Sequence, residues 1–262
     1  MVTAFAPGKC ILFGEHAVVY GQPAVAVSID AGVEVTISES SRWILEGMPF
    51  EPSRHPHISH IINEIFQYTG GPLNIDIKSE LFSAAGLGSS AALSNSMGAA
   101  LHHFLNPNEP LDLISLARIG HSAEANAQKG RASPTDTATS ALGGCIVVSG
   151  ERVRGTQHFF ETTMDTPEGS RPWSIGKVEL PEIEDVWLVL GFTGIGSPTG
   201  DMVAGVSELI KSNPLKMREI EAIGEITYSG LRALSSGNME EVGRAMNECQ
   251  DRLRKIGVSS PE

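Results

Sequence analysis

Positive charge is scarce in this chain of 262 residues, which has 19 Lys and Arg against 31 Asp and Glu. The formal net charge of −12 argues against a nucleic-acid-binding protein, because such proteins present a basic face. A locally basic pocket for phosphate groups is still compatible with this balance. Aromatic residues are also few, at 6%, whereas the 28 glycines indicate many tight turns.

Cysteines and long apolar runs are sparse as well. The three cysteines have no CxxC or metal-ligand spacing, so we interpret them as buried, reduced thiols. No run of roughly 18 apolar residues could span a bilayer, and Lys9, Glu15 and His16 interrupt the apolar N-terminus, which lacks a signal-peptide pattern. These absences predict a cytoplasmic protein that binds neither nucleic acid nor membrane.

Hydrophobic periodicity predicts a mixture of strands and helices. Residues 33–38 and 73–78 alternate between apolar and polar side chains, as half-buried strands do. Residues 58–66 have apolar side chains at helical spacing, and residues 111–128 also read as a helix. Because strands and helices do not alternate regularly, we predict an α+β fold rather than a doubly wound sheet.

The polar segments predict two lobes. Residues 161–181 are polar and rich in proline, so we interpret them as a connection between an N-terminal lobe at 1–160 and a C-terminal lobe at 182–262. Within the second lobe, the wholly apolar run Val186–Leu190 predicts a buried strand. Residues 239–256 have apolar side chains every three or four residues, which predicts a helix with one apolar stripe.

A segment of small residues lies between a predicted strand and a predicted helix: Ala85, Gly86, Leu87, Gly88, Ser89, Ser90 and Ala91. Glycines let the backbone approach a ligand closely, and a helix N-terminus offers free N–H donors to an anion. The two serine hydroxyls could bind phosphate or Mg²⁺. The segment therefore predicts a phosphate-binding loop.

The segment has three other interpretations. A Walker A loop needs a lysine directly after its glycines, and none follows here. The string Gly86-x-Gly88-x-x-Ala91 fits a dinucleotide-binding fingerprint, but residues 106–110 do not form the acidic strand end which that fold requires. A glycine- and serine-rich helix start that binds no ligand also fits the pattern.

Polar residues at the end of the first predicted strand form a second candidate group. Lys9 stands among apolar neighbours, so it lies either at a sheet edge or toward an anion. Glu15 and His16 follow at a turn, where polar side chains can converge on a small ligand.

Two carboxylates complete the set of candidates. Ser133-Pro134 predicts an N-cap followed by a proline in the first turn, which places Asp136 near a helix N-terminus. Asp136 would then either complement the helix dipole or accept a hydrogen bond from a substrate hydroxyl. Glu124 lies in the helix 111–128, either on a solvated face or as a ligand of Mg²⁺.

In this order, the constellations resemble the GHMP kinase superfamily and, within it, the archaeal mevalonate kinase family. Residues 7–21 are similar to the first motif of that family, 85–91 to its ATP loop, and 133–136 to its catalytic-aspartate region. Residues 194–206 resemble the start of its second lobe. The resemblance spans nearly the whole chain. It implies a two-lobed fold, with a first lobe like domain 2 of ribosomal protein S5 and a ferredoxin-like second lobe.

The resemblance also implies a reaction. ATP would phosphorylate the 5-hydroxyl of mevalonate to give 5-phosphomevalonate and ADP, as a step of isoprenoid biosynthesis in the cytoplasm, with Mg²⁺ as cofactor and a homodimer as the assembly. A kinase for phosphomevalonate or homoserine, or an inactive ligand-binding relative, stays open as an alternative.

Each candidate residue takes a role from the resemblance. Asp136 would be the catalytic base with Lys9 beside it, and Ser90 and Glu124 would hold Mg²⁺. His16, Glu15 and Thr199 would bind mevalonate. The family also has a glycine-rich third motif near its C-terminus, whereas this chain stops at residues 258–262 before such a loop. We therefore expect an incomplete second lobe.

Overall fold

The computed structural model describes residues 1–82, 84–130, 132–166, 169–182, 186–196 and 199–259. The chain forms two compact units. Unit 1 consists of Met1–Lys9, Ser28–Ser83 and Leu87–Gly143, and unit 2 of Cys10–Val27, Ala84–Gly86 and Gly144–Glu262. In the part of the chain that the structure describes, no helix is long and apolar enough to cross a lipid bilayer.

The sheet of unit 1 confirms the two strands predicted from alternation. Val35 and Ile37 are fully buried, and they lie opposite Ile77 and Ile75 in an antiparallel register. The polar residues between them face the other side of the sheet, as a period of two requires. In sheet order the strands are β4 (Met48–Pro49), β3 (Ile44–Leu45), β5 (Leu73–Ser79) and β2 (Ala24–Glu39), with β1 (Val2–Phe13) paired to β2.

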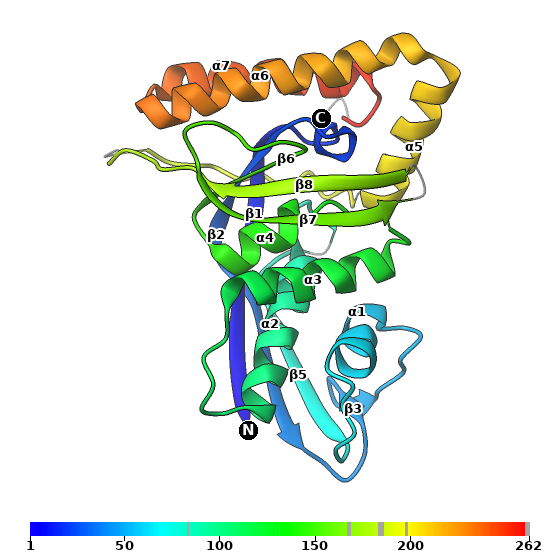
Figure 1. Cartoon of the computed structure of the whole chain (residues 1–262). Helices are drawn as coiled ribbons and strands as arrows, with labels where there is room; N and C mark the ends of the chain where they lie inside the picture. The colour runs from blue at the N-terminus through cyan, green and yellow to red at the C-terminus, as the bar shows by residue number, and fades with distance from the viewer. Residues whose placement is uncertain (83, 131, 167–168, 183–185, 197–198, 260–262) are drawn as a thin grey trace. The chain divides into compact units, whose positions relative to one another are not determined.

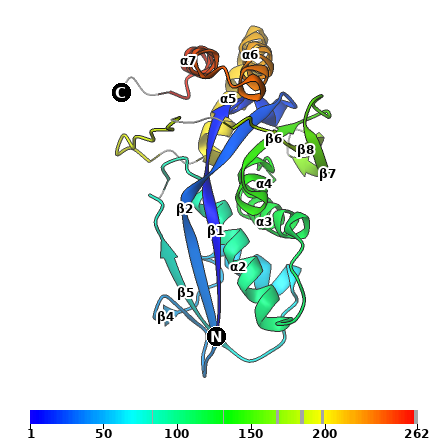
Figure 2. The same ribbon diagram turned by 90° about the vertical axis from the view of Figure 1, so that its left-hand side faces the viewer.

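Helices cover one side of these strands (Figure 2). Ile37 and Ile75 of the sheet belong to the same buried cluster as Met97 and Leu101, which lie on the longest of these helices. The predicted helix at 58–66 is present, but it divides into a short α-helix and a π-helical turn. The helical elements of unit 1 are α1 (Pro56–His60), η2 (Ile61–Ile65), α2 (Ser89–Leu105), α3 (Leu113–Ala127) and α4 (Thr135–Leu142).

Unit 2 contains a hairpin where the sequence predicted a connection. Residues 161–181 include most of two antiparallel strands, which the sequence did not predict. The division into lobes at 160 and 182 stays a prediction. In the second of these strands, residues 169–172 are mostly exposed, so no hydrophobic period marks this part of the hairpin. The strands follow β2 in the order β6 (Cys145–Ser149), β8 (Gly169–Lys177) and β7 (Gln157–Thr166).

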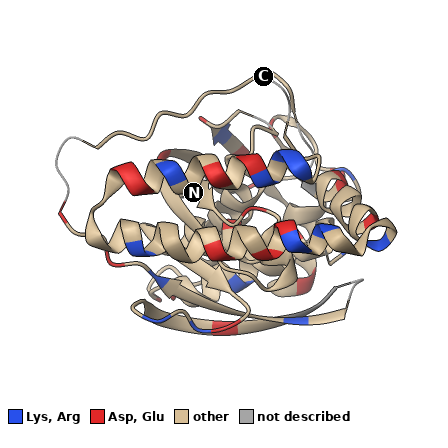
Figure 3. Cartoon of the chain, turned by 90° about the horizontal axis from the view of Figure 1, so that it is seen from above, with Lys and Arg blue, Asp and Glu red and all other residues tan. Residues whose placement is uncertain are grey.

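Two long helices of unit 2 lie side by side (Figures 1 and 3). The predicted apolar stripe at 239–256 is confirmed, because Val242, Cys249 and Leu253 are buried together with Ile223 of the preceding helix. Asn238 caps the last helix by accepting a hydrogen bond from the backbone N–H of Glu241. The helical elements are η1 (Ala17–Tyr20), α5 (Thr199–Ser212), η3 (Pro214–Lys216), α6 (Met217–Ser236) and α7 (Met239–Lys255).

The run Val186–Leu190 is not the buried strand that we predicted. All five residues are exposed, with Trp187 86% and Val189 88% accessible, and they have no strand assignment. An apolar run becomes a buried strand only if neighbouring strands satisfy its backbone groups, and none of the described residues pairs with it. Composition alone therefore could not decide its burial.

Candidate active site

Lys9 and Asp136, which are far apart in the sequence, meet in unit 1. Lys9 Nζ lies 3.2 Å from a carboxylate oxygen of Asp136, and the lysine side chain is only 6% exposed. The backbone N–H of Lys9 also donates to the carbonyl of Leu87 at 2.9 Å. A side chain at Gly8 would collide with that carbonyl at 2.8 Å, so the glycine permits the close approach of strand and loop.

Asp136 lies in the first turn of α4, as the sequence predicted. The predicted N-cap is wrong, however, because Pro134 occupies that position and the Ser133 hydroxyl donates instead to Thr135 Oγ1 at 3.1 Å. The Asp136 side chain is 35% exposed, so a small substrate can reach its carboxylate while Lys9 holds the other side. The pair thus combines a fixed cation with an accessible acceptor.

Buried polar contacts hold α4 in place. Asn95 on α2 donates to the carbonyl of Thr137 at 2.9 Å, and both residues are fully buried. A side chain at Gly120 would come within 2.1 Å of the Asn95 amide oxygen, so α3 needs glycine there. His121 Nε2 lies 3.0 Å from the carbonyl of Ala132 and fixes the chain just before α4. These contacts set the direction of the Asp136 side chain.

The predicted phosphate loop leads directly into α2. Gly88 is the N-cap with a left-handed φ of 72°, and no side chain caps the helix in the described part of the chain. The Lys9 side chain runs against Gly88, where a Cβ would lie 2.9 Å from Lys9 Cγ. The first N–H groups of α2 therefore lie beside the Lys9 cation. The N–H groups and the cation together can bind an anion. Ala85 and Gly86 belong to unit 2, and Leu87 to Ala91 to unit 1.

Glu124 is a buried carboxylate on α3. Its side chain is 6% exposed, and Oε1 lies 3.2 Å from Nε2 of His57 on α1. Gln128 donates its side-chain amide to Oε2. Burial alone would raise the pKa of Glu124, but His57 together with hydrogen bonds from Ser90 and Gln128 brings this pKa below its usual value. The group is therefore ionised at neutral pH.

The surroundings of Glu124 fit a magnesium ion. Glu124 Oε1 is buried and makes no hydrogen bond of good geometry to any described residue, and the Ser90 hydroxyl adjoins the carboxylate. No cluster of three or more His, Cys, Asp and Glu occurs among the described residues, so a metal would rely on one carboxylate. Mg²⁺ is commonly bound by one or two carboxylates together with phosphate oxygens and waters.

The predicted mevalonate contacts Glu15, His16 and Thr199 lie in unit 2. His16 is 9% exposed and has a φ of 62°, a left-handed value that costs a non-glycine residue energy and is often found at functional sites. Burial lowers the pKa of His16, against an opposing effect of Glu15. Thr199 is the first residue of α5, and its side chain lies outside what the structure describes. Their substrate role stays a prediction.

Comparison with known proteins gives the lineage of this chain. The family described as "GHMP kinases N terminal domain" matches residues 56–144, which include α2, α3 and α4. The mevalonate kinase of Methanothermobacter thermautotrophicus is 33% identical over 99% of this chain and 80% of its own length. The chain belongs to the mevalonate kinase family. The enzyme of Archaeoglobus fulgidus, 32% identical over 99% of this chain and 81% of its own length, supports the same assignment.

Solved structures agree with this family at the level of the fold. A mevalonate kinase from L. major, crystallised with R-mevalonate, superposes with a TM-score of 0.70 at 20% identity, over 100% of this chain and 77% of that one. The Methanococcus jannaschii mevalonate kinase gives a TM-score of 0.67 at 22% identity, over 99% and 80%. The mixed helix and sheet arrangement is therefore the GHMP kinase fold, as predicted.

Sequence reasoning missed three residues of this site in the mevalonate kinase fold: His57, Asn95 and Gln128. Asn95 gave one usable signal, because an amide among the small side chains of a helix is expected to be buried with a partner. Gln128 follows Glu124 by four residues, a spacing at which helical side chains meet. His57 gave no sequence signal, because only the packing of α1 against α3 brings its side chain to Glu124.

Proposed function

We propose that this chain transfers the γ-phosphoryl group of ATP to the 5-hydroxyl of mevalonate. The observation that carries the proposal is the contact of Lys9 with Asp136, beside the predicted phosphate-binding loop, in a chain of the mevalonate kinase family. The ion pair supplies an acceptor for a hydroxyl proton next to a fixed positive charge. Both are features that phosphoryl transfer to an alcohol requires.

The reaction proceeds by in-line displacement. The bond between the substrate oxygen and the γ-phosphorus forms as the bond to the β,γ-bridging oxygen breaks, and ADP leaves. Asp136 accepts the hydrogen bond of the alcohol, orients it and takes its proton late in the step. Lys9 stabilises the negative charge on the transferring group. The N–H groups at the start of α2 and the loop Leu87–Ala91 hold phosphate oxygens.

Magnesium completes this scheme through residues that the chain already holds in place. Ser90 and Glu124 would bind the ion, whose positive charge neutralises the phosphates. The ionised state of Glu124 and its unsatisfied Oε1 support this role. Ala85 and Gly86 would add to the phosphate contacts, and Glu15, His16 and Thr199 would bind mevalonate. A cytoplasmic location and a homodimeric assembly also belong to the proposal.

A substrate panel tests the function. We would measure ADP release in a coupled assay with mevalonate, phosphomevalonate and homoserine as acceptors. The proposal expects kcat/KM to be highest for mevalonate. A higher value for either other acceptor would reassign the substrate, and no acceptor-dependent ADP release with a folded chain would contradict a kinase role.

A further inference from the structure

The short helix α1 lies beside α3 (Figure 1), and two histidines of α1 contact α3. His57 Nε2 lies 3.2 Å from Glu124 Oε1. His60 Nε2 lies 2.9 Å from the Ser122 hydroxyl. The two contacts join the same pair of helices, but only the first involves a residue proposed to bind Mg²⁺. This difference provides an internal control for what each histidine does.

Glu124 is held at both of its oxygens. Gln128 donates to Oε2, and His57 faces Oε1 from a side chain that is 21% exposed. Neither His57 Nε2 nor Glu124 Oε1 makes a hydrogen bond of good geometry to another described residue, and the two atoms lie 3.2 Å apart. A carboxylate offers about four lone-pair positions, so these contacts leave room for a metal ion.

We propose that His57 is a positioning residue that orients the Glu124 carboxylate for binding Mg²⁺. This inference rests on the proposed function, which makes Glu124 a metal ligand. Mg²⁺ demands near-ideal octahedral geometry at short distances, so a carboxylate free to rotate about its last torsion binds it poorly. His57 restricts that rotation from α1, while Gln128 restricts it from the C-cap of α3. Polar partners of a ligating carboxylate are known to tune metal sites.

The test measures metal affinity rather than turnover. Mn²⁺ serves as the probe in the presence of ADP, and its binding is followed by water-proton relaxation. His57→Leu should weaken Mn²⁺ binding by about 10–100-fold, the usual effect of losing such a partner. His57→Gln, which can present an amide N–H near the position of Nε2, should restore much of the affinity. His57→Asn, which is too short to reach, should not.

His60→Leu is the matched control. It removes the second histidine contact between α1 and α3 but leaves Glu124 untouched, so its Mn²⁺ affinity should stay close to that of the unaltered chain. Steady-state kinetics give a second readout: His57→Leu should raise the metal concentration needed for half-maximal rate and leave the KM for mevalonate unchanged. Thermal melting would confirm that each variant is folded.

The possible outcomes separate the inference from the proposed function. If Glu124→Gln weakens Mn²⁺ binding and His57→Leu does not, the positioning role is wrong and the metal site stands. Equal losses in His57→Leu and His60→Leu would also overturn it, because general packing of α1 would then explain both. If Glu124→Gln leaves Mn²⁺ binding unchanged, the assignment of Glu124 as a metal ligand fails.

Discussion

The helices α2 to α4 of unit 1 and the helices α6 and α7 of unit 2 bury very different side chains. The first group buries polar residues, among them Asn95, Glu124 and Thr137, and satisfies most of them with specific partners. The second group buries an apolar stripe and leaves most of its charged residues exposed (Figure 3), apart from the partly buried pair of Arg252 with Glu219. Buried polar networks fix directions, whereas apolar stripes supply stability.

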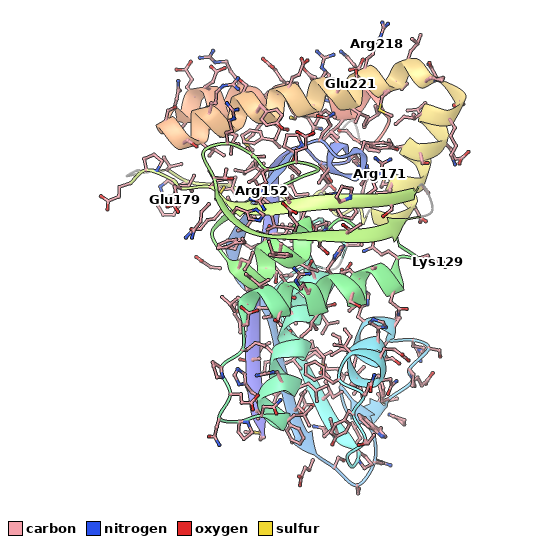
Figure 4. The ribbon with its side chains drawn as sticks, viewed as in Figure 1. Lys129, Arg152, Arg171, Glu179, Arg218 and Glu221 are labelled. Atoms are coloured by element: carbon pink, nitrogen blue, oxygen red, sulfur yellow. The ribbon has the colours of Figure 1, made fainter. Side chains whose placement is uncertain are left out.

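Most charged residues of α6 and α7 are exposed. Arg218 and Glu221 project from this helix away from β8 of the same unit (Figure 4). Arg244 of α7 pairs with Glu240 and Glu241 at 3.2 and 2.8 Å, but its side chain is 59% exposed. Exposed pairs of this kind contribute little to stability. The comparison therefore predicts that substitutions in unit 1 change activity and those in α6 and α7 change stability.

The largest effect is expected for Asp136→Asn. The amide keeps the shape of the side chain but loses the negative charge, so kcat should fall by about 10²–10⁴-fold, as for loss of a general base. Binding of ATP should persist. Steady-state kinetics and nucleotide titration would measure both quantities. A kcat within about twofold of the unaltered enzyme would remove Asp136 from the mechanism.

Lys9→Met should lower kcat by about 10²–10³-fold, the range for removing one group that stabilises transition-state charge. Methionine suits the apolar neighbours of Lys9 in β1, so the melting temperature should change little. Kinetics and calorimetry on the same preparation would separate the two effects. A large drop in melting temperature with normal kcat would make Lys9 a structural residue and weaken the contrast between the units.

Ile223→Ala should lower the free energy of unfolding and leave kcat unchanged. Ile223 is fully buried in the apolar cluster of unit 2, so its truncation should cost about 2–5 kcal/mol of unfolding free energy. The exposed Leu215, 65% accessible, provides the control Leu215→Ala. Denaturant unfolding would measure both. At temperatures where Ile223→Ala is folded, its kcat should be normal. A loss of unfolding free energy no larger than that of Leu215→Ala would contradict the account.

A smaller, pH-dependent effect is expected at His121. Burial lowers the pKa of His121 below its ordinary value of 6.5, although the Ala132 carbonyl and Glu124 oppose the shift. The unfolded chain therefore takes up the proton more readily. The stability that neutral His121 contributes is fully present above pH 6.5 and falls as the pH drops toward the folded-state pKa. His121→Gln should flatten the melting-temperature profile between pH 7 and 5 in part, since His16 shares the trend. An unchanged slope would refute the assignment.

The smallest effect is expected for Arg244→Ala. Its ion pairs are solvent-exposed, so the unfolding free energy should change by less than about 1 kcal/mol and less still in high salt. Denaturant melts at two salt concentrations would test this. A loss comparable to that of Ile223→Ala would mean that surface charge stabilises α7 as much as the apolar stripe does.

Hydrophobic periodicity correctly predicted the elements whose buried residues recur at one regular spacing. The alternation of Val35 and Ile37 predicted β2, and the stripe of Val242, Cys249 and Leu253 predicted α7. The hairpin of β7 and β8 was missed because residues 169–172 at the outer end of β8 are mostly exposed, so no hydrophobic period marks that end. The prediction of a buried strand at Val186–Leu190 failed for a different reason, because an apolar composition does not provide neighbouring strands.

Those site residues could be predicted whose own sequence segment indicates their role. Lys9, Ser90 and Asp136 could be named because each stands in a segment whose neighbours resemble a known family. Their contact could not be derived from either segment alone. His57 could not be named at all, because its meaning depends on α1 packing against α3. Tertiary contacts between distant segments are the part that local patterns leave open.

The most direct test of the central claim is ³¹P NMR of ATP and mevalonate mixed with this chain and Mg²⁺. The account predicts that the ATP signals give way to those of ADP and a new phosphate monoester, in equal amounts, and that Asp136→Asn slows this conversion sharply. Formation of inorganic phosphate alone, at a rate independent of mevalonate, would contradict it.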